Sequence, residues 1–197
     1  ALAHDSSELH VAGTATYIDD MREPEGTLHV APGYAKVGAK GKILSIDLSA
    51  VRSTPGVVVV LTAKDIPAVN DCSPALGDDP IFAENEIAFH GQVIFAVVAE
   101  TRDAARRAAQ LAKIEIAIET PAIATEDALS TDTVDVVPPY GFKRKNAAKA
   151  IAAAKHQLQD SFQIGGQEHF YLEGQVSFAI TDEQGGMIVH CSTQHPT

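Results

Sequence analysis

The stretch QVIFAVVAETRDAARRAAQLAKIEIAIE, residues 92–119, carries the strongest secondary-structure signals in the chain. It begins with residues 92–99, in which Gln92 is followed by seven apolar residues rich in valine and isoleucine, a pattern typical of a strand. Thr101 then predicts the start of a helix through about Leu111, because its hydroxyl can accept a hydrogen bond from an amide of the first turn. Residues 113–119 alternate isoleucines with charged residues, which predicts a strand with one buried face. This strand, helix, strand order predicts a compact α+β or α/β unit.

The region before this stretch predicts three more strands, at residues 27–30, 42–48 and 56–62. The last of them is a near-continuous valine run, so we expect it to be buried on both faces. A short helical turn is expected at 49–53, and the prolines, glycine and small polar residues at 65–79 predict a long surface loop.

The region after residue 120 is less regular, with prolines and acidic residues. We expect it to begin as a connecting arm with short helices at 125–129 and 147–155. Three strands are then expected, at 158–164, 174–180 and 187–191. The predicted organisation is a first domain at 1–120, the arm at 121–157, and the incomplete beginning of a second domain at 158–197.

Composition excludes several classes of protein. The net charge of −11 and the scattered Lys and Arg residues argue against nucleic acid as a partner. No apolar run is long enough to cross a bilayer, and no basic and apolar leader is visible, so we expect a cytoplasmic protein without membrane contact. Cys72 and Cys191 are far apart and in no CxxC pattern, which predicts reduced thiols rather than a disulfide framework or an iron–sulfur site.

Candidate chemistry gathers in GGQEHFYLE, residues 165–173. If this run is extended, Gln167, His169 and Tyr171 point one way, whereas a helix would instead pair His169 with Glu173. By residue type Gln167, His169 and Glu173 are possible metal ligands, but a lone His-x-x-x-Glu arises often by chance and Gln is a poor zinc ligand.

Other polar residues favour structural roles. Asp19 and Asp20 are adjacent, so we expect them to brace a loop rather than to act as an acid/base pair. His90 and His195 stand beside Gly91 and Pro196 and are expected to be turn residues. Phosphate loops, dinucleotide fingerprints and the zinc-protease and hydrolase motifs do not occur in the sequence.

The phrase at 165–173, followed by STQHP at 192–196, closely resembles the start of the molybdenum-binding part of xanthine dehydrogenases. Upstream, GTATYIDD at 13–20, KILSIDL at 42–48 and PGV at 55–57 resemble the α/β hammerhead domain of the xanthine dehydrogenase and aldehyde oxidase superfamily. The resemblance implies an α+β fold. It would consist of a hammerhead domain of mixed sheet and packed helices, a connecting arm, and the first strands of a molybdopterin-binding domain.

The resemblance also implies a role for one residue. The glutamine of the family phrase hydrogen-bonds to the apical oxygen of the molybdenum centre, and the matching position is Gln167, which would contact the cofactor without ligating the metal. His169, Phe170 and Tyr171 would serve packing and orientation. The family's cofactor loop, substrate-binding arginine and catalytic glutamate lie beyond the position of Thr197, so no catalytic residue is expected within this chain, and no activity or bound cofactor is expected for the chain alone.

The implied function is that of the N-terminal segment of the molybdenum-binding subunit of a xanthine dehydrogenase. The complete enzyme would hydroxylate hypoxanthine and xanthine to urate, with water as the oxygen source and NAD as the final acceptor. Its molybdenum–molybdopterin would sit with the rest of this subunit, and FAD and [2Fe–2S] clusters would be carried by a partner subunit. Two alternatives stay open: a scaffold or interaction module without chemistry, and a related molybdenum hydroxylase that acts on aldehydes or N-heterocycles.

Overall fold

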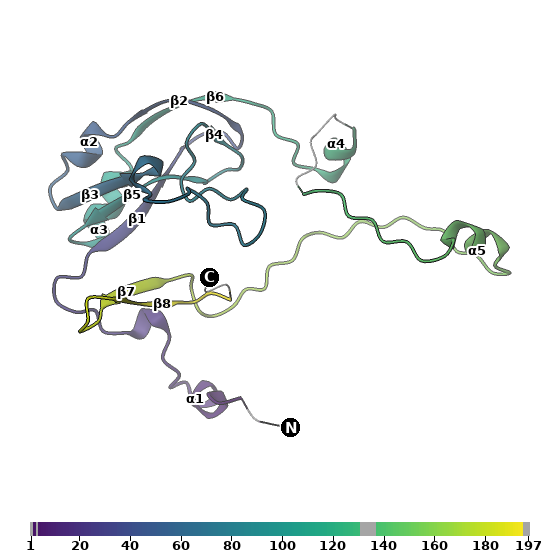
Figure 1. Ribbon diagram of the computed structural model, residues 1–197, viewed down its shortest axis with the longest axis horizontal. Coiled ribbons are helices and arrows are strands. Elements are labelled where there is room, and N and C mark those ends of the chain that lie inside the picture. The colour runs from purple at the N-terminus through teal and green to yellow at the C-terminus, as the bar shows by residue number, and fades with distance from the viewer. Residues whose placement is uncertain (1, 3, 131–136, 195–197) are drawn as a thin grey trace. The chain divides into compact units, whose positions relative to one another are not determined.

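The computed structural model describes residue 2, residues 4–130 and residues 137–194. By their contacts the residues form two units. One consists of Ala1–Pro121 together with Glu173–Thr197, and the other is Ala122–Leu172. The first unit is therefore discontinuous in sequence (Figure 1).

The described elements of the first unit are short helices and eight strands. The strands are β1 His29–Tyr34, β2 Gly41–Asp47, β3 Val57–Thr62, β4 Glu86–Ile87, β5 Val93–Ala99, β6 Lys113–Ile118, β7 Ser177–Thr181 and β8 Met187–Cys191. The helices are α1 Ser7–Ala12, α2 Ser49–Arg52 and α3 Arg102–Ala109, with 3-10 turns at Ile18–Asp20 and Ala63–Asp65. The second unit contains α4 Thr125–Ser130 and α5 Ala147–Ala153.

The first sheet has the order β1-β5-β3, and β5 pairs antiparallel with both neighbours. The strand predicted at 92–99 is thus confirmed as the central strand. Every residue of β5 after Val93 is buried, and Phe95, Val97 and Ala99 are completely covered. A strand with partners on both sides and cover on both faces is the natural place for such a continuous apolar run.

The strand predicted at 56–62 is present as β3, but the expectation that both of its faces are buried is wrong. Of its valines only Val60 is buried, whereas Val58 is 55% exposed and Val59 is 41% exposed. β3 lies at the edge of its sheet. An apolar run gives no information about whether a strand will be central or at an edge, and only a central position here provides cover on both sides.

The helix start predicted at Thr101 is confirmed. The Thr101 hydroxyl accepts a hydrogen bond from the Ala104 backbone N–H at 3.1 Å, which satisfies one of the free amides of the first turn of α3. The helix ends at Ala109, two residues before the expected end. The face of α3 that carries its alanines packs on the first sheet, where Ala105 forms a buried cluster with Ala31 and Ala99.

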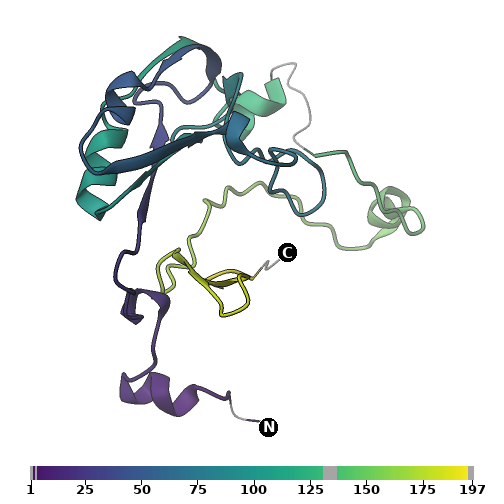
Figure 2. The same cartoon turned by 60° about the vertical axis from the view of Figure 1, so that its left-hand side comes forward.

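The second sheet has the order β4-β2-β6. β6 pairs with β2 rather than with β5, so the strand, helix, strand run passes from one sheet to the other. Because all strand pairs among the described residues are antiparallel, the unit is α+β and not a parallel β-α-β arrangement. Side chains from both sheets, α2 and α3 share one core. Figure 2 gives a second view of the backbone of this unit.

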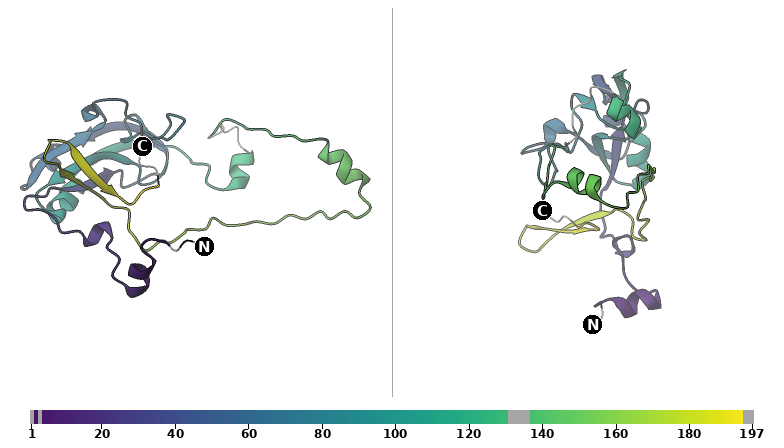
Figure 3. Two further views of the ribbon diagram at one scale, coloured as in Figure 1. Left: turned by 60° about the horizontal axis from the view of Figure 1, so that its bottom comes forward. Right: turned by 90° about the vertical axis from the view of Figure 1, so that its right-hand side faces the viewer.

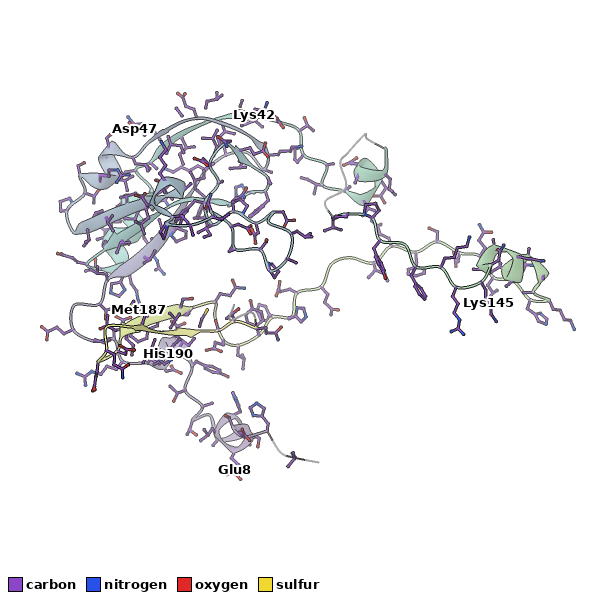
Figure 4. All side chains as sticks on the ribbon, viewed as in Figure 1. Glu8, Lys42, Asp47, Lys145, Met187 and His190 are labelled. Atoms are coloured by element: carbon purple, nitrogen blue, oxygen red, sulfur yellow. The ribbon has the colours of Figure 1, made fainter. Side chains whose placement is uncertain are left out.

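The face of β6 that was expected to be buried is only partly covered. Ile114 and Ile116 pack against the core, but Ile118 at the end of the strand is 63% exposed. Figure 4 labels Lys42 and Asp47 towards the two ends of β2, the strand with which β6 pairs.

In its described residues the second unit is mostly irregular chain with two short helices (Figure 3). The helices predicted at 125–129 and 147–155 are confirmed as α4 and α5, and the Asn146 side chain caps α5 by accepting from Lys149 N–H at 3.0 Å. The strand predicted at 158–164 is wrong: these residues form no regular structure and are exposed. Alternating apolar residues make a strand only where a second strand is available to pair with them.

The two strands predicted at 174–180 and 187–191 are confirmed as the antiparallel hairpin β7-β8. Asp182 holds the turn, because its Oδ1 accepts from the N–H groups of Gln184 at 2.9 Å and Gly186 at 2.6 Å. Gly185 adopts φ +82°, a left-handed conformation that favours glycine. Met187 and His190 are labelled on β8 in Figure 4.

Candidate functional site

Gln167, the predicted cofactor-binding residue, lies in irregular chain of the second unit and is exposed. Within the described part of the chain its side chain makes no hydrogen bond. A Cβ placed on Gly165 or Gly166 would meet no atom within 4 Å. The carboxamide therefore has both of its N–H donors and its carbonyl oxygen available for a group outside these residues.

The residues around Gln167 form neither of the two predicted arrangements. Residues 167–173 are in neither a strand nor a helix. Phe170 has φ +52°, in the left-handed region that bulky residues rarely occupy, and this interrupts the alternation expected of a strand. Glu173 is not held by His169 but by a distant residue, since its Oε1 accepts a hydrogen bond from the Ile18 backbone N–H at 3.2 Å.

Ile18 begins the 3-10 turn Ile18–Asp20. Asp20 Oδ2 accepts from the Tyr17 backbone N–H at 3.0 Å, so this carboxylate braces the loop as predicted. The Met21 N–H closes the turn on Ile18 O at 3.1 Å. Glu173 accepts a hydrogen bond from the Ile18 N–H, which has no partner within the turn itself.

A second contact fixes the chain directly after Glu173. The Ser192 hydroxyl donates to Gly174 O at 2.8 Å and accepts from Val176 N–H at 3.2 Å. The Ser192 N–H donates in turn to Val176 O at 3.2 Å. The structure thus brings Ile18, of the stretch 13–20, and Ser192 to the end of the phrase at 165–173, and no sequence spacing indicated these contacts.

A groove of about 350 Å³ lies next to this junction within the first unit. Its lining residues come from the 3-10 turn, β1, α3 and the segment leading into β7, and include Asp19, Glu23, His29, Arg102 and Ser177. Glu23 forms an ion pair with Arg102, and His29 Nε2 lies 3.7 Å from Glu23 Oε2. Within this groove the charges of Glu23 and Arg102 are therefore paired with each other.

Metal-ligating side chains are not clustered in the described residues, where no group of three or more His, Cys, Asp or Glu is placed to hold an ion. His90 lies in a turn, with Nδ1 3.2 Å from Gly38 O, as expected. His195 lies outside the described residues. None of the described helices combines the length and the apolar character needed to span a bilayer.

Cys72 and Cys191 form no disulfide. The Cys72 thiol donates to Asp79 O at 3.2 Å. Cys72 is an exposed residue, but desolvation of its sulfur by neighbouring atoms raises its pKa, and the negative charges of Asp79 and Asp71 raise it further, because both effects disfavour the thiolate.

Slow alkylation of Cys72 is therefore expected. Only the thiolate reacts with iodoacetamide, and the raised pKa leaves less of it at pH 8 than in an unfolded chain. In a Cys191→Ser background, the alkylation rate of Cys72 should rise several-fold when urea unfolds the protein. Equal alkylation rates of Cys72 in native buffer and in urea would contradict the prediction that the folded structure raises the pKa of this thiol.

Two family models match the chain. The model described as aldehyde oxidase and xanthine dehydrogenase, a/b hammerhead domain, matches residues 12–119. The model of the molybdopterin cofactor-binding domain matches residues 131–197.

Relatives and a solved structure agree with these models. A xanthine dehydrogenase of Dictyostelium discoideum is 35% identical over 197 residues, which are 100% of this chain and 14% of that protein. A probable aldehyde oxidase of Oryza sativa subsp. japonica is 34% identical over 200 residues, covering 96% of this chain and 15% of that protein. The aldehyde oxidoreductase of Desulfovibrio gigas superimposes with a TM-score of 0.78 at 28% identity, covering 96% of this chain and 23% of that one.

The chain thus spans only a small part, 14% and 15%, of the curated relatives it matches. Its fold is an α/β hammerhead domain followed by part of a molybdopterin-binding domain, as the resemblance implied. The chain belongs to the aldehyde oxidase and xanthine dehydrogenase family.

Proposed function

We propose that this chain is a segment of the molybdenum-binding subunit of a xanthine dehydrogenase. The observation that carries the proposal is the 35% identity to a xanthine dehydrogenase along the whole chain, which includes the phrase at 165–173. In the complete enzyme, hypoxanthine and xanthine are hydroxylated to urate, with water as the oxygen source and NAD as the final acceptor. The partners are the rest of this subunit and a subunit that carries FAD and [2Fe–2S] clusters, and the enzyme works in the cytoplasm.

Within this assembly the chain supplies scaffold and the amide of Gln167. When bound, the molybdenum–molybdopterin group supplies the two-electron oxidation of the substrate carbon. The Gln167 carboxamide donates an N–H to an electron-rich oxygen of that group, and it does so without adding charge and without ligating the metal. Its open surroundings and its lack of a hydrogen-bond partner among the described residues support this role.

Gln167→Ala in the complete enzyme is expected to lower turnover by roughly 10- to 100-fold, because a hydrogen bond to a charged group contributes about 1.5–3 kcal/mol. Molybdenum content and melting temperature should not change, since Gln167 is exposed and its side chain makes no hydrogen bond among the described residues. Steady-state kinetics with xanthine, together with metal analysis, provide the measurement.

The matched control is Gln163→Ala, which removes an exposed amide from the same irregular segment. It should leave turnover unchanged. Full turnover of Gln167→Ala would contradict the assignment of this residue.

A second candidate is a hydroxylase of aldehydes or N-heterocycles. It is favoured by the 34% identity to a probable aldehyde oxidase, which is nearly as high as that to the xanthine dehydrogenase. The kcat/KM values of the complete enzyme for xanthine and for an aromatic aldehyde separate the two candidates. A preference for the aldehyde would overturn the xanthine dehydrogenase proposal and leave the family assignment intact.

A further inference from the structure

We propose that Glu173 is a positioning residue for Gln167, and that it acts by tying the end of the phrase at 165–173 to the turn Ile18–Asp20. The inference rests on the proposed role of Gln167. It concerns a residue whose carboxylate already accepts a hydrogen bond from a distant backbone amide through Oε1.

Burial distinguishes Glu173 from the rest of the phrase. Residues 165–172 are all exposed, and Glu173 alone is partly buried. Its hydrogen bond to Ile18 N–H, at 3.2 Å, joins residues 155 positions apart and is itself partly shielded from water. A glutamate on a free loop would remain in solvent, so this burial reflects a specific contact.

The turn Ile18–Asp20, to which Glu173 is bonded, is held by its own hydrogen bonds. Tyr17 N–H bonds to Asp20 Oδ2, and Met21 N–H bonds to Ile18 O, so the direction of the Ile18 N–H is fixed by its own neighbours. A carboxylate is also the strongest acceptor that a side chain can offer to a free backbone N–H. The hydrogen bond between the Ile18 N–H and Glu173 is therefore favoured both by the fixed direction of the donor and by the negative charge of the acceptor.

The chain after Glu173 is held as well, since Ser192 bonds to Gly174 O and Val176 N–H. Glu173 thus lies at the point where the exposed residues 165–172 meet chain that is held by hydrogen bonds. Gln167 lies only six positions before it. Fixing one end of a short segment reduces the conformational entropy that is lost when an amide within that segment is held in one position.

The test compares two substitutions in the complete enzyme. Glu173→Ala removes the acceptor, whereas Glu173→Gln retains a side-chain oxygen that can accept from the Ile18 N–H. Hydrogen exchange of the Ile18 amide, which donates to Glu173, should become several-fold faster in Glu173→Ala and stay near wild type in Glu173→Gln. Exchange of the β5 amides should be the same in all three proteins.

Kinetics provide the second readout. Glu173→Ala should lower kcat by about 10-fold with KM for xanthine unchanged, because a misplaced group weakens the reaction step more than it weakens binding. Glu173→Gln should restore most of the loss. Glu183→Ala, which removes an exposed carboxylate from the turn between β7 and β8, is the matched control and should have no effect.

The double variant with Gln167→Ala shows whether Glu173 acts through Gln167. If it does, Glu173→Ala lowers kcat no further once Gln167 is absent. An equal further loss in that background, or unchanged exchange of the Ile18 amide in Glu173→Ala, would overturn the inference. Full turnover of Gln167→Ala would instead overturn the proposed role of Gln167, and the exchange rates alone would then decide whether Glu173 anchors the segment.

Discussion

Replacing Phe95 with alanine is expected to lower the free energy of unfolding by about 3–5 kcal/mol, the range found when a buried aromatic ring is removed from a core. Phe95 is completely buried at the centre of β5, and its strand is hydrogen-bonded on both sides. It belongs to the core that both sheets share, which includes Val51, Val60 and Val97. These neighbours sit on paired strands and packed helices and cannot all move inward to fill the space.

Urea unfolding provides the free energy, and hydrogen exchange of the β5 amides shows that the loss lies in this part of the molecule. Phe89→Ala is the matched control, because Phe89 is 54% exposed. Phe89→Ala should change the free energy of unfolding by no more than about 0.5 kcal/mol, as most surface substitutions do. If Phe95→Ala and Phe89→Ala lowered the free energy of unfolding equally, burial of the Phe95 ring would not be what stabilises the core.

The second large effect is expected for Gly33→Ala, with a loss of about 3 kcal/mol or more, at the upper end of overpacking costs. Gly33 lies opposite Phe95 across the β1-β5 pair. A Cβ at this position would overlap with Cζ, Cε1 and Cε2 of the Phe95 ring. Because the ring is completely buried, it has no solvent-facing position to which it could move.

The combination of the two sites tests this cause directly. In a Phe95→Leu background the shorter side chain leaves room, so Gly33→Ala should cost less by about 0.5–3 kcal/mol, the usual range of coupling between residues in contact. Gly141→Ala is the control, since a Cβ there meets no atom within 4 Å. Strictly additive losses at positions 33 and 95 would rule out steric conflict as the reason for glycine.

The sequence was a good guide to elements that depend on nearby residues. β5, the cap of α3 at Thr101 and the β7-β8 hairpin were all predicted, because apolar runs, capping hydroxyls and turn residues act within a few positions. Partner choice was not predictable in this way. The edge position of β3 and the pairing of β6 with β2 depend on strands far away in sequence.

The candidate site shows the same division. Gln167 was found from the wording of the phrase at 165–173, and its role remains a prediction. Short spacing in the sequence suggests only two roles for Glu173, as a helical neighbour of His169 or as a metal ligand. Its actual partner, Ile18, is separated from it by 155 positions and becomes evident only when the path of the chain is known.

The discontinuity of the first unit has a consequence for how the chain is made and how it can vary. Residues 1–121 leave the ribosome before 173–197, so both three-stranded sheets can form before the hairpin arrives. The bond between Glu173 and Ile18 then closes a long loop, and each doubling of a flexible loop adds only about 0.6 kcal/mol to the closure cost. The segment Ala122–Leu172 can therefore lengthen or shorten between relatives with little effect on how firmly its two ends are held.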